Sequence, residues 1–164
     1  MANRISNTKI GDIFCAQVDG TTKRYLQYII SDMEQLNSDV IRAFKKVYPI
    51  DATPILEEIV SDQVDFYAHC VTKAGIKFGF WQTVGNSPQV GDTDILFRDK
   101  RDWTISKGKT DDDWWIWYVN QPFDHVGKLS EENRKADLGL IFHPEDIVCK
   151  LKTGTLGNIF AHFE

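Results

Sequence analysis

Short apolar runs separated by turn residues fill the first third of the chain and predict β-strands. One run extends from Asp12 to Val18 and ends at Asp19-Gly20, and the next, rich in aromatic and β-branched residues, extends from Arg24 to Ile30. Asp-Gly between two such runs is typical of a hairpin turn. Residues 38–48 contain apolar positions that fit a helical face, but their β-branched and aromatic content favours a third strand.

The middle of the chain predicts further strands. Residues 64–71 and 76–83 flank Lys73-Ala74-Gly75, which predicts a second hairpin. The most apolar segment, Trp114–Val119, predicts a strand near the centre of a sheet. Other short strands are expected at residues 94–98, 103–106 and 147–151.

Three segments predict short helices. Thr53-Pro54 precedes an apolar and acidic run, and these two residues suit an N-cap and a first helical position. Ser130 is a candidate N-cap for a helix that extends to Asp137, and Gly139 is a plausible end signal. A single helical turn is expected at residues 143–146, and loops are expected at residues 107–113 and 120–128.

These elements predict a single domain, residues 1–164, of the α+β class. The β-structure should be predominantly antiparallel, arranged as a strongly curved sheet or an SH3-like partial barrel with two or three short helices. A chain of 164 residues can bury a hydrophobic core without help from disulfides or metals.

Composition and charge indicate a cytoplasmic protein that does not bind a membrane or nucleic acid. The N-terminus lacks the apolar run of a secretory signal, and no stretch approaches the roughly 20 apolar residues that span a bilayer. The net charge is −5, whereas nucleic-acid binding depends on clustered Lys and Arg. Three widely spaced cysteines indicate reduced thiols, and no metal site or cofactor is expected.

Candidate catalytic residues are few. Asp124 and His125 could form an acid–base pair, but residues adjacent in sequence seldom point at the same atom, and no nucleophile motif accompanies them. No glycine pattern matches a phosphate-binding loop. We therefore expect a protein that is not an enzyme.

Acidic residues beside tryptophans form the stronger candidate for a binding surface. Three carboxylates, Asp111, Asp112 and Asp113, precede Trp114, and they suit an acidic rim around an aromatic anchor as well as a solvated turn. Strand periodicity gives the WWIWY segment two interpretations: burial on both faces, or one exposed face that binds a protein or a sugar ring. The residues predicted to contact a partner are Asp111, Asp112, Asp113, Trp114, Glu131 and Glu132.

The chain resembles the immunity-protein-26 family of bacterial polymorphic toxin systems over roughly residues 8–156. The resemblance begins with K-I-G-D-I-F at Lys9–Phe14. The chain departs from the family pattern in having a longer insert around residues 85–109. Its later landmarks are Trp117, Gly127, the ADLG of Ala136–Gly139, Pro144–Ile147 and Lys152-Thr153-Gly154. G-D-I-F also resembles the opening of the SH3-like barrel of bacterial toxin RNA endonucleases, which are shorter and more basic.

The family resemblance implies an antidote that binds a cognate toxin domain, expected to be basic, and blocks it by occlusion. The alternatives are an RNA-cleaving or hydrolytic enzyme on a small β-barrel, with Asp124 and His125 as first suspects, and a carbohydrate-binding module that uses exposed Trp. The pattern leaves the oligomeric state open, because an aromatic face could also pair with a second copy of itself.

Overall fold

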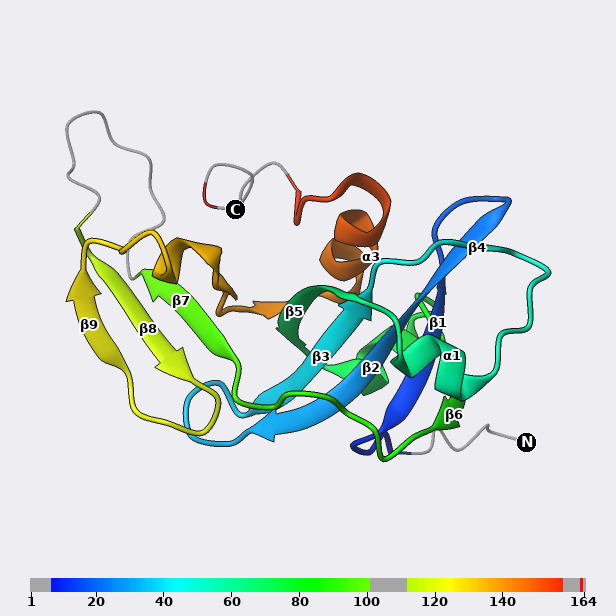
Figure 1. Cartoon of the computed structure of the whole chain (residues 1–164), viewed down its shortest axis with the longest axis horizontal. Coiled ribbons are helices and arrows are strands. Elements are labelled where there is room, and N and C mark those ends of the chain that lie inside the picture. The colour runs from blue at the N-terminus through cyan, green and yellow to red at the C-terminus, as the bar shows by residue number, and fades with distance from the viewer. Residues whose placement is uncertain (1–6, 101–111, 158–162, 164) are drawn as a thin grey trace.

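Two β-sheets of unequal size form the frame of the protein (Figure 1). The computed structural model describes residues 7–100, 112–157 and 163. The larger sheet has seven strands in the order β11-β5-β3-β2-β1-β6, with β4 paired to β2, and the smaller has four in the order β10-β7-β8-β9. Pairing is antiparallel except between β11 and β5 and between β10 and β7. The α+β class with mostly antiparallel strands is therefore confirmed, and neither sheet closes into a barrel within the described residues.

The larger sheet contains β1 (Asp12–Gln17), β2 (Thr22–Asp32), β3 (Ser38–Phe44), β4 (Tyr48–Pro49), β5 (Val64–Cys70), β6 (Gln82–Asn86) and β11 (Ile141–Phe142). The smaller contains β7 (Leu96–Lys100), β8 (Trp114–Tyr118), β9 (Asp124–Gly127) and β10 (Asp137–Leu138). The helices are α1 (Leu56–Val60), α2 (Thr72–Lys77), α3 (Pro144–Thr153) and the single 3-10 turn η1 (Asn133–Lys135).

The first hairpin and the third strand are confirmed. In the turn between β1 and β2, Asp19 Oδ1 accepts hydrogen bonds from the backbone nitrogens of Thr21 and Thr22 at 2.8 and 2.7 Å. These bonds lower the pKa of Asp19 to about 2. Residues 38–48 form β3 and β4 rather than a helix.

The predicted second hairpin is wrong, because residues 72–77 form helix α2 and β6 pairs with β1. Both edges of β5 are already paired, with β3 and β11, so no returning strand can lie beside it. Gly75 also allows the Trp81 ring to pack directly on α2, since a Cβ there would lie 1.9 Å from the indole. The Trp81 indole N–H then donates to the carbonyl of Thr72 at 3.0 Å.

Three other elements also differ from expectation. The predicted loop at residues 120–128 contains β9, which pairs with β8. The helix expected after Ser130 is only the η1 turn, in which Ser130 Oγ accepts from the Asn133 backbone nitrogen at 3.1 Å. The helical turn expected at residues 143–146 is the start of helix α3, which continues through residues 147–151, where a strand was expected. The buried residues of α3 share one helical face, and Gly154, at φ 84°, ends the helix. The expected strand at 103–106 lies outside the described residues.

Three apolar clusters make up the core of the described part of the chain. The largest lies between one face of the larger sheet and α3, and it includes Phe14, Ile41 and Ile147. A second lies beneath α1. The third joins the two sheets, because Val40 of β3 packs with side chains of the smaller sheet that include Trp117.

Residues 87–95 connect the two sheets, and we call them the crossing segment. Two buried polar side chains fix this segment in place through hydrogen bonds to its backbone. Gln27 donates from Nε2 to the carbonyl of Ser87 at 3.1 Å, and Arg42 donates from Nη2 to the carbonyl of Gln89 at 2.8 Å. Arg42 also donates from Nε to Gln27 Oε1 at 3.0 Å. Burial lowers the pKa of Arg42, and no described carboxylate lies within ion-pair distance of it.

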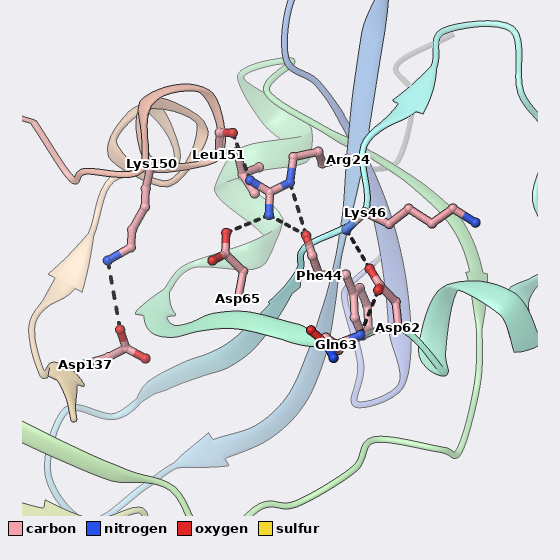
Figure 2. A network of polar contacts seen from close by, with 9 residues as sticks. All are labelled: Arg24, Phe44, Lys46, Asp62, Gln63, Asp65, Asp137, Lys150 and Leu151. Atoms are coloured by element: carbon pink, nitrogen blue, oxygen red, sulfur yellow. Dashed lines mark hydrogen bonds and ion pairs between the residues drawn. The ribbon is translucent and has the colours of Figure 1, made fainter. Parts of the chain in front are cut away.

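A second buried arginine ties α3 to the larger sheet, as Figure 2 shows. Arg24 donates from Nη1 to the carbonyl of Leu151 at 2.9 Å and from Nη2 to the carbonyl of Phe44 at 2.5 Å. Its guanidinium also pairs with Asp65 at 2.7 Å. The end of α3 is therefore fixed to β2, β3 and β5 through one side chain.

Candidate partner-binding surface

The β8–β9 hairpin carries both the buried and the exposed aromatic residues of the smaller sheet. β8 lies between β7 and β9, and Trp114 and Trp117 are only 2% and 1% exposed. These two side chains lie on opposite faces of the strand and belong to different core clusters. Burial on both faces of β8 is therefore the correct interpretation for these two tryptophans.

Four residues with solvent-accessible atoms gather on this hairpin. We call Asp113, Trp115, Phe123 and His125 the hairpin surface. Trp115 lies directly opposite His125 in the β8–β9 pairing, and their ring centroids are 4.5 Å apart. Phe123 packs edge-on against Trp115 at 6.2 Å. The sheet thus holds an aromatic group in place at low entropic cost, which favours its use in recognition.

An ion pair borders these aromatic rings. His125 Nε2 lies 3.3 Å from Asp113 Oδ1, and both side chains are 47% exposed. A half-exposed pair of this kind contributes at most about 1 kcal/mol to stability. Its main effect is to orient the imidazole beside Trp115 while Asp113 keeps atoms available to solvent.

The predicted partner-binding residues fall into three groups. Asp112 is exposed and Asp113 is half-buried, at the start of β8, whereas Asp111 lies outside the described residues. Trp114, predicted to contact a partner, instead lies in the core beneath Arg98 at 5.0 Å and is only 2% exposed. Its side chain points inward because strand alternation turns Trp115, not Trp114, toward the hairpin surface.

Glu131 and Glu132 are exposed, in the segment that precedes η1. In Figure 1 this segment crosses the end of the smaller sheet at which β8 begins and β9 ends. The Glu132 carboxylate pairs with Lys135 at 3.2 Å, and both side chains are largely exposed. The exposed acidic residues near 112–113 and 131–132 thus lie at the same end of the smaller sheet.

The structure separates Asp124 from His125. Asp124 is opposite Ile116 and His125 is opposite Trp115, so the two neighbours point to different faces of β9. The carboxylate that reaches His125 belongs to Asp113. Only the hairpin register reveals this pair, and the register depended on recognising β9 as a strand.

A buried polar centre, absent from the sequence-based candidates, joins the two sheets. Asp32 Oδ2 lies 2.8 Å from His69 Nε2 and accepts from the indole nitrogen of Trp117 at 3.0 Å. Asp32 Oδ1 accepts from the backbone nitrogen of Asn120 at 3.3 Å. Burial of Asp32 opposes its ionisation, but the hydrogen bonds outweigh this effect and lower its pKa to about 2.

This centre is structural rather than catalytic. Asp32 and His69 are fully buried, so no substrate reaches them. Because the Asp32 carboxylate is ionised and can only accept, Nε2–H of His69 donates the hydrogen bond to it. The Nδ1 of His69 then faces the core without a hydrogen-bond partner among the described residues. The described part of the chain also contains no group of His, Cys, Asp or Glu placed to hold a metal ion.

Comparison with known proteins gives no relative for this chain. No protein-family model matches it, and neither a curated protein nor a solved structure matches it. Within the described ranges, no helix has the length and apolar character needed to cross a membrane.

Proposed function

We propose that this protein is a non-catalytic binding module that blocks a basic protein partner by occluding it with the hairpin surface. The partner we propose is the cognate toxin domain of a bacterial polymorphic toxin system, as the resemblance to the immunity-protein-26 family implies. A cytoplasmic site of action and the SH3-like character of the fold belong to the same proposal.

One observation carries the proposal: Asp113, Trp115, Phe123 and His125 form a rigid, partly exposed aromatic group beside carboxylates. Binding hot spots typically have an aromatic centre from which water is excluded and a polar rim around it. The net charge of −5 would also speed the approach of a basic partner.

The test begins with a tagged protein used to capture partners from the source lysate, including the products of neighbouring genes. For a captured toxin domain, we expect one-to-one binding and loss of toxin activity in the complex. Trp115→Ala should weaken binding about 30-fold or more, because truncating a hot-spot aromatic costs about 2 kcal/mol or more. Tyr118→Ala is the matched control, since Tyr118 is exposed on the same strand but its side chain points to the other face.

Charge variants test the electrostatic part of the proposal separately. Asp113→Asn should slow association more than it speeds dissociation, and the difference should shrink as salt rises. Capture of no toxin domain, or equal affinity for Trp115→Ala and Tyr118→Ala, would remove the basis for this function.

The pair formed by Asp113 and His125 favours a second candidate, an RNA-cleaving or hydrolytic enzyme. A half-exposed imidazole 3.3 Å from a carboxylate has the arrangement of a general base and its orienting group. If the purified protein degrades RNA and His125→Ala abolishes the cleavage, the enzyme replaces the binding module as the function. If the wild-type protein leaves RNA intact, the RNA-cleaving form of this candidate is rejected.

A further inference from the structure

The outer edge of β6 carries neither charged residues nor proline, two features that commonly protect an edge strand. β6 is the last strand of the larger sheet, and among the described residues it pairs only with β1. Its five residues, Gln82–Asn86, include no charged side chain and no proline. Natural proteins normally place charges or proline on such an edge, because its unpaired backbone groups can bind another strand. β6 is short, and a β-bulge at Val84, which has no register partner on β1, interrupts its pairing.

Exposed apolar side chains accompany β6 at its start, middle and end. Phe78, which is 65% exposed, precedes the strand by four residues, and Val84, at its middle, is 42% exposed. Ile10, 49% exposed, is held at the other end because Asn86 Nδ2 donates to its carbonyl at 3.1 Å. The edge therefore combines free backbone groups with a row of apolar contacts.

A groove of about 510 Å³ adjoins the Gln82 end of this edge. Its walls include Ile76, Phe80 and Trp81, and the only charged residue among its described lining residues is Lys23. The chain as a whole carries a net charge of −5, so two copies repel each other overall. The β6 strand and the groove present no described carboxylate, so this edge adds no repulsion between carboxylates to a contact between two copies.

We propose that β6 is a self-association edge, at which two copies of the chain pair antiparallel about a two-fold axis through Val84. A two-fold contact must be self-complementary, because the same patch is used twice. In this arrangement Val84 meets the second copy's Val84, and Phe78 of each copy lies toward Ile10 of the other. The larger sheet then continues from one copy into the next.

This edge is separate from the hairpin surface. Figure 1 shows β6 and β9 toward opposite ends of the molecule. Self-association would therefore leave both hairpin surfaces accessible, and the dimer would present two of them. The inference does not depend on the proposed function.

Sedimentation velocity over about 5 to 500 µM protein tests the self-association. The wild-type chain should shift from monomer to dimer as concentration rises. Val84→Lys should raise the dissociation constant more than about tenfold, because two like charges then face each other across the axis. Met33→Lys is the matched control: Met33 is 65% exposed, lies away from β6 and should leave dimerisation unchanged.

A charge-swap experiment makes the test specific to the two-fold axis. Val84→Lys and Val84→Glu should each be monomeric, and their equimolar mixture should form a heterodimer because opposite charges then meet. Phe78→Glu provides a second route to the same interface, and circular dichroism checks that each variant is folded. A wild-type chain that stays monomeric at the highest concentration, or a Val84→Lys chain that dimerises as the wild type does, overturns the proposal.

Discussion

Removing the carboxylate of Asp32 should weaken the junction between the two sheets. In Asp32→Ala, the Nε2–H of His69 and the indole N–H of Trp117 lose their acceptor while both rings remain buried. Each orphaned buried donor costs about 1–3 kcal/mol, so we expect the free energy of unfolding to fall by about 4 kcal/mol. Because domains of this size are stabilised by only about 5–15 kcal/mol, this loss is large.

Asp32→Asn provides a graded comparison. The amide keeps one acceptor oxygen for His69 and Trp117 but loses the negative charge, so we expect a smaller loss of about 2 kcal/mol. Urea unfolding followed by tryptophan fluorescence and by far-ultraviolet circular dichroism measures both variants. A loss below about 1 kcal/mol in Asp32→Ala would refute the reasoning, because it would mean that the two donors find other acceptors.

The pH dependence of stability gives an independent check. The folded-state pKa of Asp32, about 2, lies below its ordinary value of 3.8. Its stabilising contribution is therefore fully present above pH 3.8 and is lost as the pH falls through about 2. The difference between these two pKa values corresponds to about 2 kcal/mol of folding stability, since one pKa unit is about 1.4 kcal/mol. Asp32→Asn should lose this part of the acid sensitivity, and an unchanged acid profile in that variant would count against the assignment.

Other positions allow further tests. Arg42→Met should cost about 3 kcal/mol and speed proteolysis within residues 87–95, because it removes the buried donor that holds the crossing segment; an unchanged cleavage rate would contradict that role. Gly139→Ala should cost more than about 2 kcal/mol in urea unfolding, since its Cβ would lie 1.9 Å from the Trp117 ring. Burial raises the pKa of the Cys70 thiol, so Ellman's reagent should modify it only in denaturant, whereas the half-buried Cys15, whose pKa burial also raises, should react slowly in the native protein.

The sequence predicted elements whose determinants are local. The Asp19-Gly20 turn and the flanking apolar runs specify the first hairpin without reference to the rest of the chain. α2 was missed because its position depends on Trp81 packing against Gly75 and on both edges of β5 being occupied. A short apolar segment cannot carry that information by itself.

The candidate site shows the same division. The acidic run before β8 and the tryptophans are visible in the sequence, but the choice of Trp115 over Trp114 depends on which face of β8 is buried. The pairing of Asp113 with His125 depends on the register of β9. The Asp32 centre was not foreseeable, because its partners His69 and Trp117 lie 37 and 85 positions away along the chain.

The ribosome makes α3 after it has made most of the sheet that this helix covers. Ile147 and Leu151 of α3 complete the apolar cluster on the larger sheet, and Arg24 of β2 finds one of its acceptors at the carbonyl of Leu151. When the ribosome has made six strands of that sheet, its main apolar face is still uncovered, and the smaller sheet must be translated before the covering helix emerges. The nascent chain therefore carries an uncovered apolar face while residues 87–153 are made, and we expect the larger sheet to complete its folding only after α3 has been translated.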